Sequence, residues 1–136
     1  HALEKIFIML KPDCIKRKLS GKIISRFERK GFELVNLKKI TPSRELMEEH
    51  YAEHREKLFF NDLVNFMMSG PVICMIWEGT DIVNVSRQMV GATYPKQPPP
   101  GTIRGDFAPT RRENLVHASD SLESADREIN LWFKSV

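Results

Sequence analysis

Apolar residues occur along this chain in two arrangements, which predict two kinds of secondary structure. Short apolar runs at residues 5–10 and 71–77 predict buried strands, and the mostly apolar segment 32–40 predicts a third strand. Pro12 ends the first of these strands because proline cannot donate to a sheet. A fourth, very short strand is predicted at residues 115–116.

Apolar stripes with a spacing of three or four residues, such as Ile23, Ile24 and Phe27, predict helices between these strands. The expected helices span residues 20–30, 41–54, 58–68, 81–90 and 120–133. Typical boundary residues support these limits: Ser20, Thr41 before Pro42, and Asp120 with Glu123 in capping-box spacing at the starts, and Gly31 and Gly91 at the ends.

The resulting element order is β-α-β-α-α-β-α-loop-β-α. Strands that alternate with helices, with one helical pair inserted, favour an α/β (α+β) fold of the ferredoxin-like sandwich type, with helices packed on a four-stranded antiparallel sheet. A doubly wound sheet is the alternative on this pattern alone. We expect residues 1–136 to form a single domain.

Residues 92–113 form a long stretch without regular periodicity. Loops of about 20 residues inside a compact domain are usually functional or disordered. Several prolines stiffen this one, and it carries or borders four polar candidates, Thr93, Arg104, Asp106 and Asn114. We therefore predict an ordered, functional loop.

Composition narrows the class of protein. Hydrophobic residues make up 41% of the chain and charged residues 29%, which suits a globular domain. The apolar runs are far shorter than the ~20 residues of a membrane helix, and the first residues do not resemble a signal peptide. Two cysteines, Cys14 and Cys74, cannot form a disulfide framework, which fits a reducing, cytoplasmic location. The net charge of +3 indicates only a mild preference for anionic partners.

The chain has neither a P-loop nor a Gly-x-Gly-x-x-Gly motif, so side chains would have to bind the phosphates of any nucleotide. Lys11, at the end of the first strand, Arg87 and Arg104 are suitable cations. The alternative is that all three are solvated surface charges.

His117 is the best candidate for covalent chemistry, since it lies between a short strand and a capped helix. An imidazole with an ordinary pKa of ~6.5 is a competent nucleophile at neutral pH. Glu128, on the flank of the last predicted helix, could turn inward and fix the imidazole tautomer. The alternative is a structural histidine with Glu128 in solvent.

Two other features are ambiguous. His50 and His54 are four residues apart on a predicted helix and could share a zinc ion, but no third ligand is evident. Phe59 and Phe60 point about 100° apart on a helix, so that one could be buried while the other faces a cleft.

These residues lie in segments that resemble the nucleoside diphosphate kinase family, in one register over nearly the whole chain. The segments are FIMLKPD at 7–13, EEHYAEH at 48–54, FFNDLVNFMMSGPV at 59–72, GATYPKQPPPGTIRGDF at 91–107 and ENLVHASDSLESADREINLWF at 113–133.

The resemblance implies a ping-pong kinase that carries the γ-phosphoryl group on His117. It assigns Glu128 to the second ring nitrogen, Tyr51 to positioning, Ser119 to a hydrogen bond near the site, and Phe59 to stacking on the base. The implied contacts to phosphates or ribose are Lys11, Arg87, Thr93, Arg104 and Asn114. Mg²⁺ would arrive on the nucleotide phosphates, and the subunits would form a homo-oligomer, with a hexamer favoured over a tetramer.

The chain departs from the commonest family pattern at three places. Ala118 stands where Gly is usual, Tyr94 stands where Asn is usual, and the sequence stops at Val136, where longer members continue into a segment that packs between subunits.

Two other functions compete with the kinase. An RNA-binding module of the same fold would carry a basic and aromatic strand signature, which is absent, so nucleic acid is not indicated. A catalytically silent interaction protein would have lost site residues, and all those implied by the resemblance are present.

Overall fold

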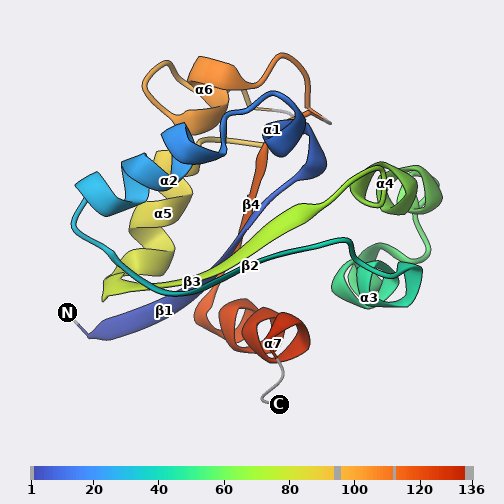
Figure 1. The fold of residues 1–136 in the computed structure, drawn as a ribbon, viewed down its shortest axis with the longest axis horizontal. Helices are drawn as coiled ribbons and strands as arrows, with labels where there is room; N and C mark the ends of the chain where they lie inside the picture. Colours follow the sequence, from blue (N-terminus) through green and yellow to red (C-terminus); the bar gives the residue numbers. More distant parts are fainter. Residues whose placement is uncertain (1, 94–95, 112, 134–136) are drawn as a thin grey trace.

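The computed structural model describes residues 2–93, 96–111 and 113–133, and its centre is a four-stranded sheet (Figure 1). The strands are β1 (Leu3–Leu10), β2 (Glu33–Ile40), β3 (Val72–Thr80) and β4 (Val116–Ala118), in the order β2-β3-β1-β4. All three neighbouring pairs are antiparallel. The ferredoxin-like prediction is confirmed, and the doubly wound alternative is wrong.

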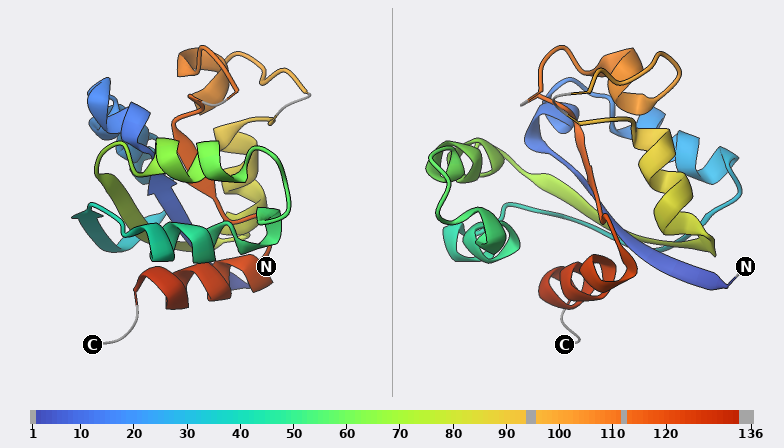
Figure 2. Two further views of the ribbon diagram at one scale, coloured as in Figure 1. Left: turned by 90° about the vertical axis from the view of Figure 1, so that its right-hand side faces the viewer. Right: turned by 180° about the vertical axis from the view of Figure 1, so that it is seen from behind.

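Helices cover both faces of the sheet (Figure 2). They are α1 (Pro12–Lys16), α2 (Ser20–Arg29), α3 (Arg44–His50), α4 (Phe60–Met67), α5 (Ile82–Val90), α6 (Ile103–Phe107) and α7 (Leu122–Trp132), with a 3₁₀ turn η1 (Ala52–His54). The helices α2, α5 and α6 share one apolar cluster with the sheet, and α3, α4 and α7 share the other.

The position of β1 between two cores explains why its sequence is apolar without alternation. Its residues Ile6, Ile8 and Leu10 join the core beneath α2 and α5, whereas Phe7 and Met9 join the core beneath α3, α4 and α7. Both faces of the strand are buried, so that every position from 6 to 10 is apolar and inaccessible.

Three predicted helix caps are wrong by one or two residues, although α2 begins at Ser20 as predicted. Ser43, not Thr41, caps α3, because its side chain accepts a hydrogen bond from the Leu46 N–H at 3.1 Å. Ser20 is the first residue of α2 and provides no cap bond. Ser121, not Asp120, caps α7 by accepting from the Ser124 N–H.

The helix predicted over 41–54 also ends early. Tyr51 leaves the helical conformation with φ −99° and ψ 23°, and η1 follows as a separate turn. This break places His50 and His54 on different elements.

Two short helices, α1 and α6, are absent from the predicted order. Pro12 both ends β1 and occupies the first turn of α1, where its missing N–H is tolerated. Within the stretch predicted to be irregular, Thr102 caps α6 by accepting from the Gly105 N–H at 3.0 Å.

The short strand predicted at 115–116 is shifted towards the C-terminus. Leu115 has a positive φ of 74°, which interrupts the extended backbone, and β4 begins at Val116. The buried carboxylate of Asp13 accepts the Leu115 N–H at 3.1 Å and holds this conformation. His117 therefore lies within a strand rather than after one.

None of the helices in the described part of the chain combines the length and the apolar composition that crossing a bilayer requires.

Candidate functional site

His117 is the central residue of β4, where it pairs with Met9 of β1. Its neighbours Val116 and Ala118 pack into the core beneath α5, so His117 points to the opposite face, towards α7. There its Nε2 atom lies 3.0 Å from Oε2 of Glu128, which is buried. Glu128 has thus turned inward from α7 to contact the imidazole.

Ser119 contacts the other carboxylate oxygen of Glu128 and is fully buried. Its hydroxyl donates to Oε1 of Glu128 at 2.6 Å and accepts the Phe7 N–H at 3.3 Å. The Ser119 N–H in turn donates to the Phe7 carbonyl at 3.1 Å. The orientation of Glu128 is therefore tied to the central strand of the sheet.

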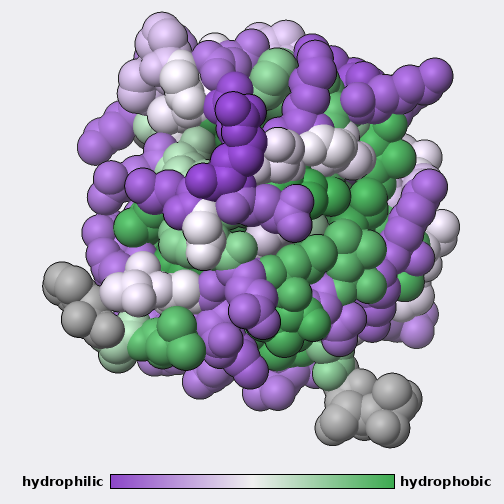
Figure 3. Space-filling model, turned by 60° about the vertical axis from the view of Figure 1, so that its left-hand side comes forward, coloured by the Kyte–Doolittle hydropathy of each residue, from purple (hydrophilic) through white to green (hydrophobic). Residues whose placement is uncertain are grey.

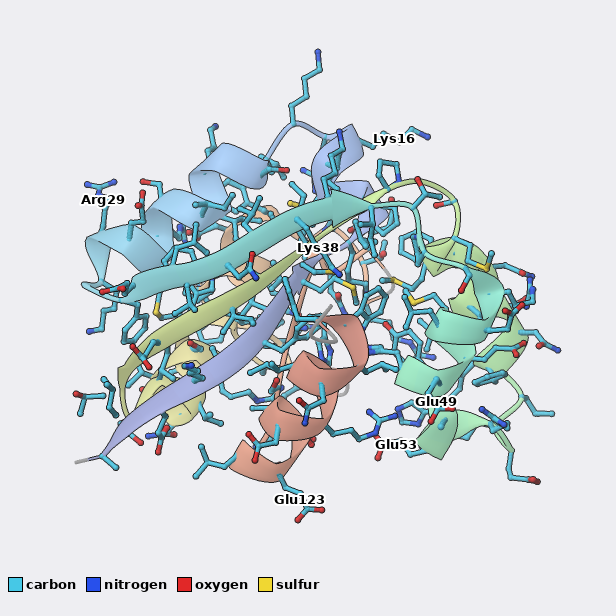
Figure 4. The ribbon with its side chains drawn as sticks, turned by 60° about the horizontal axis from the view of Figure 1, so that its bottom comes forward. Lys16, Arg29, Lys38, Glu49, Glu53 and Glu123 are labelled. Carbon is cyan, nitrogen blue, oxygen red and sulfur yellow. The ribbon has the colours of Figure 1, made fainter. Side chains whose placement is uncertain are left out.

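His117 and Glu128 line a cavity of about 530 Å³ between β4, α7 and the turn after α3. The other residues that line it and were predicted for the site are Tyr51, Arg87, Thr93 and Arg104. Glu53 of η1 and Glu123 at the start of α7, both labelled in Figure 4, line the same cavity.

A second cavity of about 580 Å³ adjoins the first, because both are lined by His54 and Thr93. The predicted residues Lys11, Phe59 and Asn114 line it. Phe59 is 46% exposed whereas its neighbour Phe60 is 7% exposed, so one ring faces the cavity and the other is in the core.

Lys11 directly follows the last residue of β1 and is almost fully buried. Its Nζ donates to Oδ1 of Asn114 at 2.8 Å. Burial lowers the pKa of Lys11 to about 8, an effect that Asp13 opposes and Arg104 reinforces. Burial raises the pKa of Asp13 above its ordinary value, and the charge of Lys11 opposes this shift.

Arg87 and Arg104 contact the backbone on either side of His117. Arg87 donates to the Ala118 carbonyl at 3.3 Å, and Arg104 donates to the Val116 carbonyl at 2.7 Å. Arg104 also donates to the carbonyls of Asn114 at 3.4 Å and Gly91 at 3.2 Å. Burial, then the charge of Arg87, lowers the pKa of Arg104 to about 10.

Tyr51 follows α3 and lies against the ring of His50 at a centroid distance of 4.7 Å. Burial, and then the charge of Glu128, raises the pKa of the Tyr51 phenol, so the hydroxyl stays protonated at neutral pH.

The structure thus brings nine of the ten predicted residues to two adjoining cavities and places the tenth, Ser119, behind Glu128. Tyr94 lies outside the described residues. Ala118 is buried, and its carbonyl accepts from Arg87.

Sequence reasoning missed two residues of this region. His54 lines both cavities, yet its spacing from His50 suggested only a zinc ligand. Asp13 holds the Leu115 backbone, and its position directly after Lys11-Pro12 gave no sign of that contact.

Within residues 2–93, 96–111 and 113–133, one group of three potential metal ligands occurs, formed by His50, His117 and Glu128. Two imidazoles and one carboxylate suit a transition metal better than Mg²⁺, which prefers oxygen ligands. The zinc site considered for His50 and His54 is not found among the described residues, where the one ligand group lacks His54. Nδ1 of His50 instead accepts a hydrogen bond from Trp132 at 3.0 Å.

Comparison with known proteins agrees with this geometry. The family description "Nucleoside diphosphate kinase" matches residues 4–136. A nucleoside diphosphate kinase of Exiguobacterium sp. is 59% identical over 134 residues, covering 98% of this chain and 96% of that protein. The human nucleoside diphosphate kinase 3 is 55% identical over 134 residues, covering 98% of this chain and 79% of that protein.

Solved structures show the same fold. The apo nucleoside diphosphate kinase of Encephalitozoon cuniculi superposes with a TM-score of 0.92 at 46% identity and covers 95% of this chain and 88% of that one. A nucleoside diphosphate kinase family protein of Babesia bovis has a TM-score of 0.92 at 47% identity, covering 96% and 88%. From the arrangement around His117 and from these matches, the chain belongs to the nucleoside diphosphate kinase family.

Proposed function

We propose that this protein transfers the γ-phosphoryl group of a nucleoside triphosphate to a nucleoside diphosphate in a ping-pong reaction, with His117 as the carrier. One observation supports this function above all others. The imidazole of His117 lines a cavity shared with two arginines, while its Nε2 atom is held by a buried carboxylate.

In the proposed reaction, Nδ1 of His117 is the nucleophile, because Nε2 faces Glu128. Its lone pair forms a bond to the γ-phosphorus as the bond from that phosphorus to the β–γ bridging oxygen breaks. The nucleoside diphosphate leaves with that electron pair, and the phosphoramidate remains. A terminal oxygen of the second diphosphate then attacks the phosphorus and releases His117.

The surrounding residues supply positioning and positive charge, which account for most of the catalysis of phosphoryl transfer. We assign the phosphates to Arg87, Arg104 and Thr93 in the first cavity, and the hydroxyl of Tyr51 to the transferred group. The pair Lys11–Asn114 serves the phosphates and ribose, and Phe59 stacks on the base without selecting one. Ser119 and Glu128 fix the tautomer of His117.

Mg²⁺ is proposed as the cofactor, carried by the nucleotide. The cavity next to His117 fits this arrangement, since its arginines could bind the phosphates that carry the ion. The single group of three potential ligands among the described residues has two imidazoles, and Mg²⁺ prefers oxygen ligands. When bound, Mg²⁺ neutralises charge on the phosphate oxygens.

We also propose a homo-oligomer, with a hexamer as the expected form, in the cytoplasm. β2 is an edge strand whose side chains Val35 and Leu37 are 42% and 41% exposed, and such edges favour pairing with another chain. Figure 3 shows a hydrophobic area on one side of the molecule, of a kind that often marks contacts between chains.

The proposed location in the cytoplasm is consistent with the cysteines. Cys14 and Cys74 are buried free thiols, which fits a reducing compartment.

The deciding experiment is labelling with triphosphate carrying ³²P at the γ position. We expect acid-labile, base-stable phosphate on the wild-type protein and none on His117→Ala. A coupled assay with ATP and several diphosphates then measures exchange. Full exchange activity in a folded His117→Ala protein would rule out the proposed function.

A further inference from the structure

His50 is a buried histidine that the proposed reaction leaves unused, although it contacts the nucleophile. It is the last residue of α3 and is 4% exposed. Its ring lies 4.7 Å from the ring of His117, edge to face at 78°. It also lines the cavity around His117 and Glu128.

Trp132, at the end of α7, determines which nitrogen of His50 carries a proton. The indole Nε1–H donates to Nδ1 of His50 at 3.0 Å, and both residues are buried. An indole nitrogen can only donate, so Nδ1 must accept and carries no hydrogen. The neutral His50 ring is therefore protonated on Nε2.

The surroundings keep His50 neutral. Burial, followed by the nearby charges, lowers its pKa well below the ordinary value of a histidine. The ionisable groups that face it come from β4, α7, the end of β1 and the turn after α3: His117, Arg127, Glu128, Lys11, Tyr51 and His54.

The neutral state of His50 is important because the carboxylate of Glu128 lies close to both histidines. Ligand atoms of His50, His117 and Glu128 all lie within 4.8 Å of one another. A protonated His50 would attract the carboxylate of Glu128 and draw it away from Nε2 of His117. A neutral ring leaves Glu128 to His117, and its edge-to-face contact restricts rotation of the His117 ring.

We infer that His50 is a positioning residue for phosphoryl transfer: Trp132 locks it as the neutral Nε2–H tautomer, and in this form it orients the His117 ring and leaves Glu128 bonded to it. The inference rests on the proposed function of His117. It adds a chain of contacts, from Trp132 through His50 to His117, that links the end of α7 to the nucleophile.

The first test is ¹⁵N NMR of the imidazoles in the wild-type protein between pH 5.5 and 8. We expect His50 to show a hydrogen on Nε2 alone and no titration. A hydrogen on Nδ1, or titration near ~6.5, would overturn the inference. This outcome is independent of activity, so it stands apart from the labelling result for His117.

The second test measures the rate of phosphoenzyme formation in stopped flow. Trp132→Phe keeps an aromatic ring stacked on Phe7 but removes the N–H. We expect a mixture of His50 tautomers, a rate about tenfold lower, and KM for the triphosphate within twofold. Trp77→Phe is the matched control, because it removes the indole N–H from the opposite core, where it contacts Met75. It should leave the rate within twofold.

The double variant His50→Phe with Trp132→Phe separates positioning from packing. Its ring at position 50 has no tautomers and no charge, so we expect it to recover much of the rate lost in Trp132→Phe. If packing alone were important, the second substitution would lower the rate further, and that result would refute the inference. Thermal unfolding of each variant confirms that it is folded.

Discussion

Ser119 and Glu128 are joined by a 2.6 Å hydrogen bond through Oε1, the carboxylate oxygen that His117 does not contact. Each oxygen of the buried carboxylate thus has its own partner. Because Ser119 is also bonded to Phe7 of β1, the sheet determines the direction in which Glu128 presents its other oxygen to His117.

Ser119→Ala removes the donor to Oε1 and leaves that oxygen buried. We expect phosphorylation of His117 to slow roughly tenfold, which corresponds to about 1.4 kcal/mol, as Glu128 loses its orientation. Ser86→Ala is the control, since Ser86 is buried and its Oγ has no hydrogen-bond partner among the described residues. It should keep the rate and raise the free energy of unfolding. Equal rates in both variants would contradict this role of Ser119.

Glu128→Gln tests the tautomer of His117. If the new carbonyl accepts from Ser119, the new amide N–H₂ faces Nε2 of His117, which must then accept. The imidazole hydrogen moves to Nδ1 and blocks the proposed nucleophile. We expect the labelling rate to fall by about 10²- to 10⁴-fold. Glu123→Gln, an exposed change in the same cavity, should stay within about threefold of wild type in the same assay.

Lys11 predicts a pH dependence of substrate capture. Because burial lowers the pKa of Lys11 to about 8, the free enzyme loses this charge as the pH rises through that value. We expect kcat/KM, which reports on the free enzyme, to fall about tenfold per pH unit well above pH 8. Lys11→Arg keeps its charge in this range and should flatten the profile.

Lys11 also affects stability, and here the expected effect of raising the pH is an increase rather than the decrease expected for kcat/KM. Between the pKa of about 8 in the folded protein and the ordinary lysine pKa of 10.5, the unfolded chain binds more protons at Lys11 than the folded chain. The contribution of Lys11 to the free energy of unfolding therefore rises with pH over this window. Chemical denaturation of wild type and Lys11→Arg across the window measures it, and a fall in the wild-type contribution would refute the assignment.

Gly105→Ala tests the loop that carries Arg104. A Cβ at position 105 would lie 1.9 Å from the Pro99 carbonyl oxygen, so α6 and Arg104 must shift. We expect a loss of about 2 kcal/mol or more in stability and a higher KM for nucleotide.

Gly21→Ala is the opposite case, since its added Cβ in α2 would meet no other described atom within 4 Å beyond the adjacent residues and the local helix backbone. Alanine at this helical position should stabilise the protein by roughly 0.5–1 kcal/mol. Melting temperatures that move in the same direction for the two variants would contradict this reading of the loop.

The sheet and both helical layers could be predicted because the long elements have clear periodicity. β1 and β3 are apolar runs because both faces are buried, and α2 and α5 carry stripes. The five-residue helices α1 and α6 are too short for a stripe. The shift of β4 follows from the φ of Leu115, which a contact with Asp13 determines across 102 residues.

The site shows the same division. Spacing alone left His117 and Glu128 ambiguous, because the direction of Glu128 depends on Ser119 and on the exact start of α7. The family resemblance supplied that pairing. It did not supply the bond from Trp132 to His50, which joins residues 82 apart and leaves no trace in a local motif.

Arg87 and Arg104 hold the carbonyls of Ala118 and Val116, one on each side of His117. In the proposed reaction, the phosphates of a bound nucleotide would share these guanidinium groups with β4. We expect the two carbonyls to compete with the phosphates for these groups as the proposed diphosphate product departs, which would favour its release. Because one product must leave before the next substrate binds in the proposed ping-pong cycle, this competition would speed turnover.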